Sequence, residues 1–140
     1  MPSIGFAIFA ALAFGVWTVF HKIAAPHINQ VFGAIVVSFT AVIFGLAILI
    51  SQLKGVQLIT NPKGLFFLIF AGIAAFFIDF FALQAYSRGL QITVGGPIII
   101  GGSIAVAAII GFAFGEQISA LKLFALFLIL VGSGLLARFV

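Results

Sequence analysis

Charged residues are scarce in this sequence: Lys, Arg, Asp and Glu together make up 6% of its 140 residues. A soluble domain carries about 25% charged residues, so this chain could not cover a water-facing surface. It has no cysteine, which excludes disulfides and thiolate chemistry. Apolar residues are in excess instead, since 65% are hydrophobic, 19 are Phe, and the mean hydropathy is +1.46. The composition predicts an integral membrane protein.

Five apolar stretches are long enough to cross a bilayer as helices. Each is close to the roughly 20 residues that a spanning helix needs, and we place them at 4–24, 31–53, 65–86, 93–114 and 119–138. Turn residues such as Asn61 and Pro62 separate them, and Ser119 is placed to cap the fifth helix. We therefore expect an all-α membrane protein with one domain over residues 1–140.

Asp79 lies among phenylalanines in the third stretch, in FFIDFFALQAYSRG (76–89). An Asp at the centre of a membrane helix costs roughly 2.5–3.5 kcal/mol on insertion scales. Residues three and four apart share a helix face, and the face of Asp79 carries Gly72, Ala75, Ala82 and Tyr86. Small residues favour contact between helices, whereas bulky apolar ones suit lipid. Asp79 is therefore predicted to point into the protein.

Three interpretations of Asp79 stay open. It binds a substrate or a proton, because acids that face the interior of a membrane bundle are functional by default. Alternatively, it pairs with Lys22, since the first and third helices run in the same direction and the two residues differ in depth by roughly 7–8 Å, within the reach of a lysine stem. The third interpretation is a hydrogen-bonded acid without a further role.

The fourth predicted helix carries a stripe of small residues at every fourth position, Ser103, Ala107, Gly111 and Gly115. Such stripes let helix backbones approach closely in lipid, and similar stripes occur on the first, second and third helices. We therefore predict a tightly packed bundle with a dimer seam on the fourth helix.

Few polar residues are available to line a cavity. The candidates for substrate binding are Trp17, Thr18, Ser38, Asp79, Tyr86 and Ser103. So few polar groups cannot provide the hydrogen-bond partners that a sugar phosphate needs. An apolar or aromatic compound with one amine fits better, because Trp17 and Tyr86 offer cation–π faces and Asp79 a counter-charge. His21 and His27 are too few for a metal site, and we interpret them as interface residues. We expect no metal, cofactor, nucleic-acid partner or enzyme activity.

Residues 82–137 resemble the second part of an EamA-type repeat of the drug/metabolite transporter superfamily, and FGVWTVFHKIA near the start resembles the first helix of that repeat. The matching features are the turn Leu83 to Gly89, Pro97, Gly115 with Glu116, Gly132 with Gly134, and Gly15, Trp17 and Lys22 in the first helix. The resemblance implies a carrier of small metabolites or drugs, often an exporter, that works by alternating access.

The resemblance also implies an assembly. Members of this superfamily typically contain two such units in ten helices, so the chain resembles one half-unit of an inverted-repeat transporter, expected in a prokaryotic inner membrane. The resemblance assigns no role to Asp79. Glu116 matches the acid of the repeat, and we expect it to lie at the positive N-terminus of the following helix.

The positive charges predict no preferred orientation. If the helices alternate in direction, one side holds Lys54, Lys63 and Lys122, and the other holds Lys22, Arg88 and Arg138. Orientation follows the imbalance of Lys and Arg in short loops, and three against three gives none. We therefore expect insertion in both orientations and an antiparallel homodimer, as in inverted repeats, or a paralogous five-helix partner. A lipid-intermediate flippase and a non-transporting assembly partner are the alternative functions.

Overall fold

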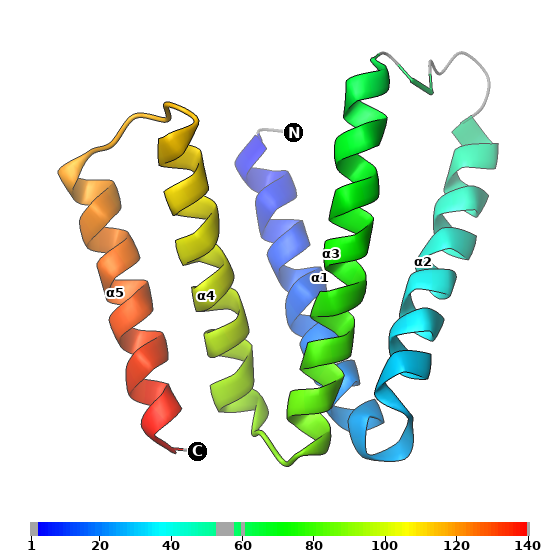
Figure 1. Cartoon of the computed structure of the whole chain (residues 1–140), viewed down its shortest axis with the longest axis horizontal. Coiled ribbons are helices and arrows are strands. Elements are labelled where there is room, and N and C mark those ends of the chain that lie inside the picture. The colour runs from blue at the N-terminus through cyan, green and yellow to red at the C-terminus, as the bar shows by residue number, and fades with distance from the viewer. Residues whose placement is uncertain (1–2, 53–57, 60, 140) are drawn as a thin grey trace.

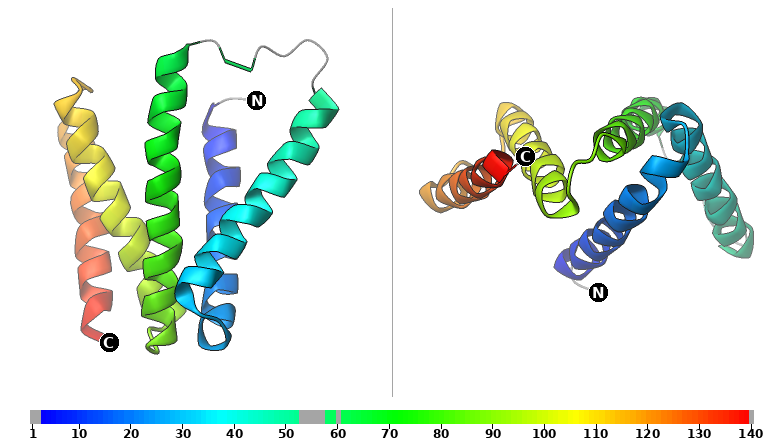
Figure 2. Two further views of the ribbon diagram at one scale, coloured as in Figure 1. Left: turned by 45° about the vertical axis from the view of Figure 1, so that its right-hand side comes forward. Right: turned by 90° about the horizontal axis from the view of Figure 1, so that it is seen from below.

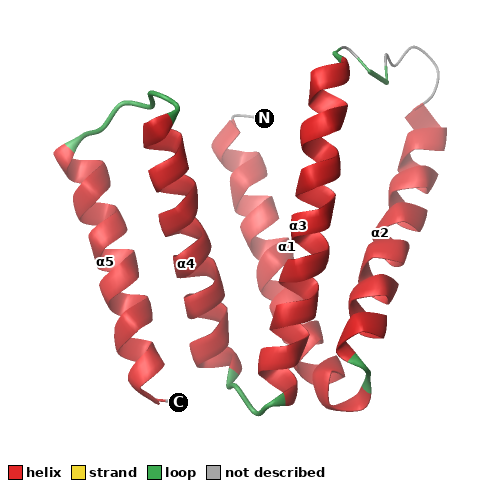
Figure 3. Cartoon of the chain, in the orientation of Figure 1, coloured by secondary structure: helices red, strands yellow, loops and turns green. Residues whose placement is uncertain are grey.

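The structure, a computed structural model, describes residues 3–52, 58–59 and 61–139, and the described fold is helical with short turns (Figure 3). In chain order it contains α1 (Ser3–Ala24), η1 (Ala25–His27), α2 (Gln30–Gln52), α3 (Pro62–Ser87), α4 (Ile92–Ala113), α5 (Ala120–Leu136) and η2 (Ala137–Phe139). The helices α1 to α4 are long and apolar enough to cross a membrane. The fifth predicted span forms the shorter apolar helix α5, of 17 residues.

The capping residues explain where α3 and α5 begin. The Asn61 side chain accepts a hydrogen bond from the Lys63 backbone N–H at 2.9 Å, and Pro62 follows as the first helical residue. Proline suits the first turn because its missing N–H would have no partner there, so α3 starts before the predicted residue 65. Ser119 Oγ accepts a hydrogen bond from the Lys122 N–H at 3.2 Å, which confirms the predicted cap of α5.

Helices α3 and α4 end in the same glycine turn. Gly89 has φ +99° and Gly115 has φ +88°, a left-handed conformation that glycine adopts without strain. The N–H of Leu90 donates to Ala85 O at 3.3 Å, and the N–H of Glu116 donates to Gly111 O at 3.0 Å. These are Schellman closures. They reverse the chain, so that each following helix runs antiparallel to the one before it.

Glu116 does not cap α5 as predicted. The cap is the Ser119 side chain, and the Glu116 carboxylate folds back over α4, where a Cβ on Gly111 would lie 3.0–3.2 Å from its atoms. This contact also interrupts the predicted dimer seam, because Gly111 is covered by its own chain while Ser103, Ala107 and Gly115 stay exposed.

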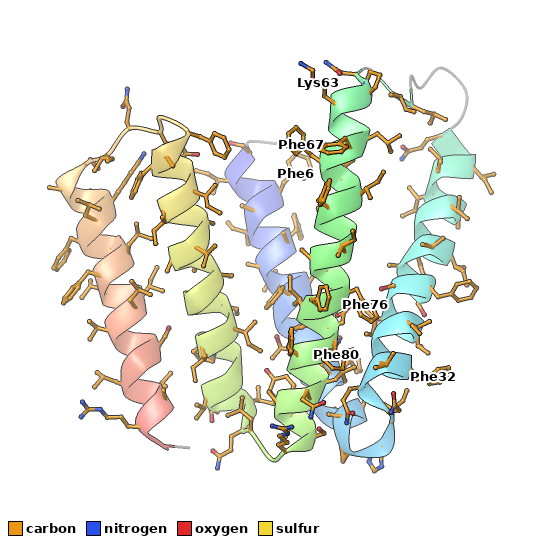
Figure 4. All side chains as sticks on the ribbon, viewed as in Figure 1. Phe6, Phe32, Lys63, Phe67, Phe76 and Phe80 are labelled. Atoms are coloured by element: carbon orange, nitrogen blue, oxygen red, sulfur yellow. The ribbon has the colours of Figure 1, made fainter. Side chains whose placement is uncertain are left out.

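The helices alternate in direction, and the two ends of the chain lie at opposite ends of the molecule (Figure 1). Helices α1 and α3 run the same way, which confirms the prediction. Lys63 lies at the end where α3 begins (Figure 4), together with Lys122 at the start of α5. The opposite end carries Lys22, Arg88 and Arg138, whereas Lys54 lies outside the described residues.

The bundle is closed at one end and open at the other. Figure 2 shows α2 leaning away from the other helices, and the view from below shows the helices fanned out. The core lies where α1 and α3 end, and consists of Ala25, Ala82, Leu83 and Tyr86, with Trp17 packed against it. Large apolar side chains project from every helix elsewhere. Among the described residues, the predicted tight packing is found at the closed end and between α4 and α5, where Gly101 is buried against Ser133.

Candidate functional site

Asp79 is buried between α3 and α1, with 6% of its surface exposed. It stands eight residues before the end of α3 at Ser87, about 12 Å along the helix. Its Oδ1 accepts a hydrogen bond from Trp17 Nε1 at 3.0 Å and lies 3.1 Å from His21 Nε2. The prediction that Asp79 points into the protein is confirmed.

His21 is the member of this cluster that the sequence interpretation missed. It is 4% exposed, its Nδ1 lies 3.0 Å from the Trp17 carbonyl oxygen, and its ring centroid lies 3.8 Å from that of Trp17. Its interpretation as an interface residue is therefore wrong, although His27 is exposed as expected. The available signal was spacing, because Trp17 and His21 are four residues apart and so share a helix face.

Lys22 does not form the ion pair with Asp79 that was one of the three open interpretations. Its Nζ instead donates to the Tyr86 carbonyl oxygen at 3.4 Å and lies 5.9 Å from the centroid of the Tyr86 ring. The last carbonyl groups of a helix lack intrahelical partners and carry the negative end of its dipole. The lysine stem therefore extends toward the end of α3 and does not bend inward, and the partner of Asp79 is His21.

Two apolar cavities flank the cluster. One, of about 290 Å³, lies between α1, α2 and α3, and its lining includes Trp17, His21 and Leu83. The other, of about 470 Å³, lies between α1 and α3 and is lined by Trp17 and Asp79 among apolar residues. Pockets for small molecules measure roughly 300–1,000 Å³. The first cavity is thus just below that range and the second within it, and the cluster stands between them.

The structure brings only some of the other candidate residues to this place. Tyr86 is 1% exposed, and its hydroxyl has no hydrogen-bond partner among the described residues. Thr18 is buried but faces α4, where a Cβ on Gly96 would lie 3.6 Å from its methyl group. Ser38 and Ser103 are exposed, and Ser103 donates to Ile100 O within its own helix. The site is therefore Trp17, His21 and Asp79, with Tyr86 and Lys22 below it.

The chemistry of the cluster is that of a single acid in apolar surroundings. One carboxylate oxygen is held by an indole N–H and an imidazole, and Trp17 lines both cavities. The Trp17 ring itself lies against two rings of its own helix, with centroids 4.9 Å from Phe14 and 3.8 Å from His21. Within the described ranges, no group of three or more His, Cys, Asp or Glu side chains could hold a metal ion. The arrangement offers a ligand one counter-charge beside aromatic side chains.

No family model, curated protein or solved structure matches this chain. The part of the chain that the structure describes defines the class: it is all-helical, with four helices that are long and apolar enough to cross a membrane. The resemblance to EamA-type repeats stays a prediction.

Proposed function

We propose that this chain is an integral membrane transporter for small metabolites or drug-like compounds, and that its substrates are organic monocations with an apolar or aromatic part. The observation that carries this proposal is the buried Asp79, held by Trp17 and His21 between two cavities. An acid in a membrane-spanning segment is costly, roughly 2.5–3.5 kcal/mol at the helix centre. A function that uses its charge explains why it is there.

The lining of the cavities supports a cation over other substrates. Asp79 supplies a negative charge, and two aromatic side chains, Phe14 and Trp17, line the same cavity, where aromatic rings favour cations. The remaining lining is mostly apolar, as for Ala75 and Ile78 in the larger cavity. A phosphate or sugar would leave most of its polar groups without partners there, at about 1–3 kcal/mol each. A small amine with one or two rings matches both the charge and the volume.

The open shape of the bundle supports an assembly of two units. Helices α1 and α2 diverge from their joining turn (Figures 1 and 2), and both carry large exposed apolar side chains. A second five-helix unit in the opposite orientation would cover such side chains and produce an inverted repeat that alternates in access. We propose an antiparallel homodimer, with a paralogous partner chain as the alternative, acting as an exporter in a prokaryotic inner membrane.

Two other functions are less well supported. A lipid-intermediate flippase needs a polar groove for a headgroup, and both cavities beside Asp79 are lined mostly by apolar side chains. A non-transporting assembly partner needs no buried acid, so the Asp79 cluster would have no role in it.

Exchange of a labelled cation across vesicles tests the proposal. Purified protein in liposomes preloaded with unlabelled benzyltrimethylammonium should take up the labelled cation by counterflow, and should not exchange benzenesulfonate. Asp79→Asn should abolish the exchange. Glu116→Gln is the matched control, because Glu116 is the other acid of the sequence and is exposed. Wild-type vesicles that exchange no cation, or Asp79→Asn vesicles that exchange it at the wild-type rate, would contradict the proposal.

A further inference from the structure

We infer that His21 and Asp79 share a single transferable proton, and that a substrate cation and this proton compete for the pair. The shared proton follows from the contacts of His21 alone. The competition rests on the proposed function, because it names the ion that replaces the proton. Together they make the site an exchanger of one cation for one proton.

Both ring nitrogens of His21 face oxygen atoms. The Trp17 carbonyl oxygen, 3.0 Å from Nδ1, can only accept, so the hydrogen of this contact lies on Nδ1. Asp79 Oδ1 lies 3.1 Å from Nε2, and one further hydrogen is needed between them. Either an imidazolium donates it to a carboxylate, or a carboxylic acid donates it to a neutral imidazole. The pair holds one shared proton in both forms, and its net charge is zero.

Among the described residues, the neighbouring elements offer no other charge to the pair. From α1, Lys22 turns away to the Tyr86 carbonyl. The other titratable side chains of α3 are Lys63 in its first turn and Tyr86 in its last. From α2 the wall beside His21 is formed by side chains that do not ionise, Gly33, Val36, Val37 and Thr40. From α4, Gly96 meets α1 at Thr18. The exposed His27 of η1 is the other histidine.

Loss of the shared proton leaves one negative charge in apolar surroundings. Either a returning proton or a monocation restores neutrality, and both together would leave a net positive charge. Burial of an uncompensated charge is strongly unfavourable, so the two ligands exclude each other. The proton that leaves is the one between Nε2 and Oδ1, and it passes to water when the cation enters the cavity beside Asp79.

Trp17 is the single tryptophan of the sequence, and its contact with both members of the pair makes it a reporter that needs no ligand. An imidazolium quenches an adjacent indole, and a carboxylate near the indole N–H shifts its emission. The emission of folded protein in detergent should therefore change with pH in a transition of one proton. His21→Gln should abolish the transition, and the matched variant His27→Gln should keep it. A folded wild type without such a transition, or a transition that survives in His21→Gln, overturns the shared proton.

Binding of benzyltrimethylammonium tests the competition, because this permanent cation carries no proton of its own. Below the pH of the Trp17 transition, calorimetry in buffers of different ionisation enthalpy should count one proton released per cation bound. The apparent Kd should rise tenfold for each pH unit below that transition. Cation binding below the transition without proton release overturns the inference and leaves the proposed function standing. A protein that shows the transition but binds no cation overturns the competition and the proposed cation specificity together.

Discussion

Replacing Asp79 by Asn and by Ala separates the contribution of its charge to stability from that of its hydrogen bonds. The carboxylate oxygen Oδ1 lies 3.0 Å from Trp17 Nε1 and 3.1 Å from His21 Nε2. Asn keeps the volume and one carbonyl oxygen at this position, whereas Ala keeps neither. Both substitutions remove a charge for which insertion scales assign roughly 2.5–3.5 kcal/mol.

The expected changes in the free energy of unfolding follow from these contacts. A hydrogen bond to a charged group contributes about 1.5–3 kcal/mol and a neutral one about 0.5–1.5. Asp79→Asn therefore weakens two bonds by roughly 2 kcal/mol in total, which the loss of the charge offsets, leaving a net change within about 1 kcal/mol. Asp79→Ala leaves Trp17 and His21 without this partner, at about 1–3 kcal/mol each. We expect the Ala variant to be roughly 2 kcal/mol less stable than the Asn variant.

Reversible unfolding in mixed dodecylmaltoside and SDS micelles measures this difference, with far-ultraviolet circular dichroism following the helices and Trp17 emission following the site. The matched pair Glu116→Gln and Glu116→Ala changes an exposed acid and should differ by less than about 0.5 kcal/mol. If Asp79→Asn and Asp79→Ala are both as stable as the wild type, the two contacts contribute nothing. If both variants lose the same amount of stability relative to the wild type, the charge itself holds α1 to α3.

The remaining predictions concern the partner of Asp79 and the assembly. In double-mutant cycles of unfolding, Asp79→Asn should couple to His21→Gln by about 1 kcal/mol and to Lys22→Gln by less than about 0.5; the reverse order would place the lysine on the carboxylate. Tags on loops at either end should be accessible from both sides of the membrane in comparable amounts, and a single orientation would require a partner chain. Ala107→Leu, on the exposed part of the predicted seam, should lower the yield of cross-linked dimer while the monomer still inserts. An unchanged yield would move the interface to another helix.

The helices were predictable because composition and length determine them almost alone. Each predicted stretch coincides with an observed helix to within three residues at either end. The direction of Asp79 was also predictable, since helical spacing puts it on one face with Ala82 and Tyr86, and all three are buried. Helical spacing did not show which face of α1 contacts the Asp79 face of α3. The prediction named Trp17 and Thr18 as candidates and Lys22 as a possible partner of Asp79, whereas the contacts with Asp79 are made by Trp17 and His21.

The predicted tight packing of the whole bundle and the possible ion pair between Lys22 and Asp79 are not observed, and each has a physical reason. Gly72 and Ala75 continue the small face of α3 but are exposed, because a stripe of small residues does not say whether its neighbour belongs to the same chain. The difference in depth between Lys22 and Asp79 is within the reach of a lysine stem. The carbonyl groups at the end of α3, however, compete with Asp79 for the Lys22 ammonium group. Once Lys22 contacts the Tyr86 carbonyl, the shorter His21 side chain one residue earlier is the group that meets Asp79.

Uptake of labelled benzyltrimethylammonium under two different driving forces tests the exchange at the Asp79–His21 pair most directly. A one-for-one exchange of a monocation for a proton moves no net charge. Vesicles that are acidic inside, with no membrane potential, should therefore accumulate the cation, and Asp79→Asn vesicles should not. A potassium diffusion potential, negative inside and without a pH gradient, should drive no accumulation. Accumulation that follows the membrane potential and ignores the pH gradient would contradict the account.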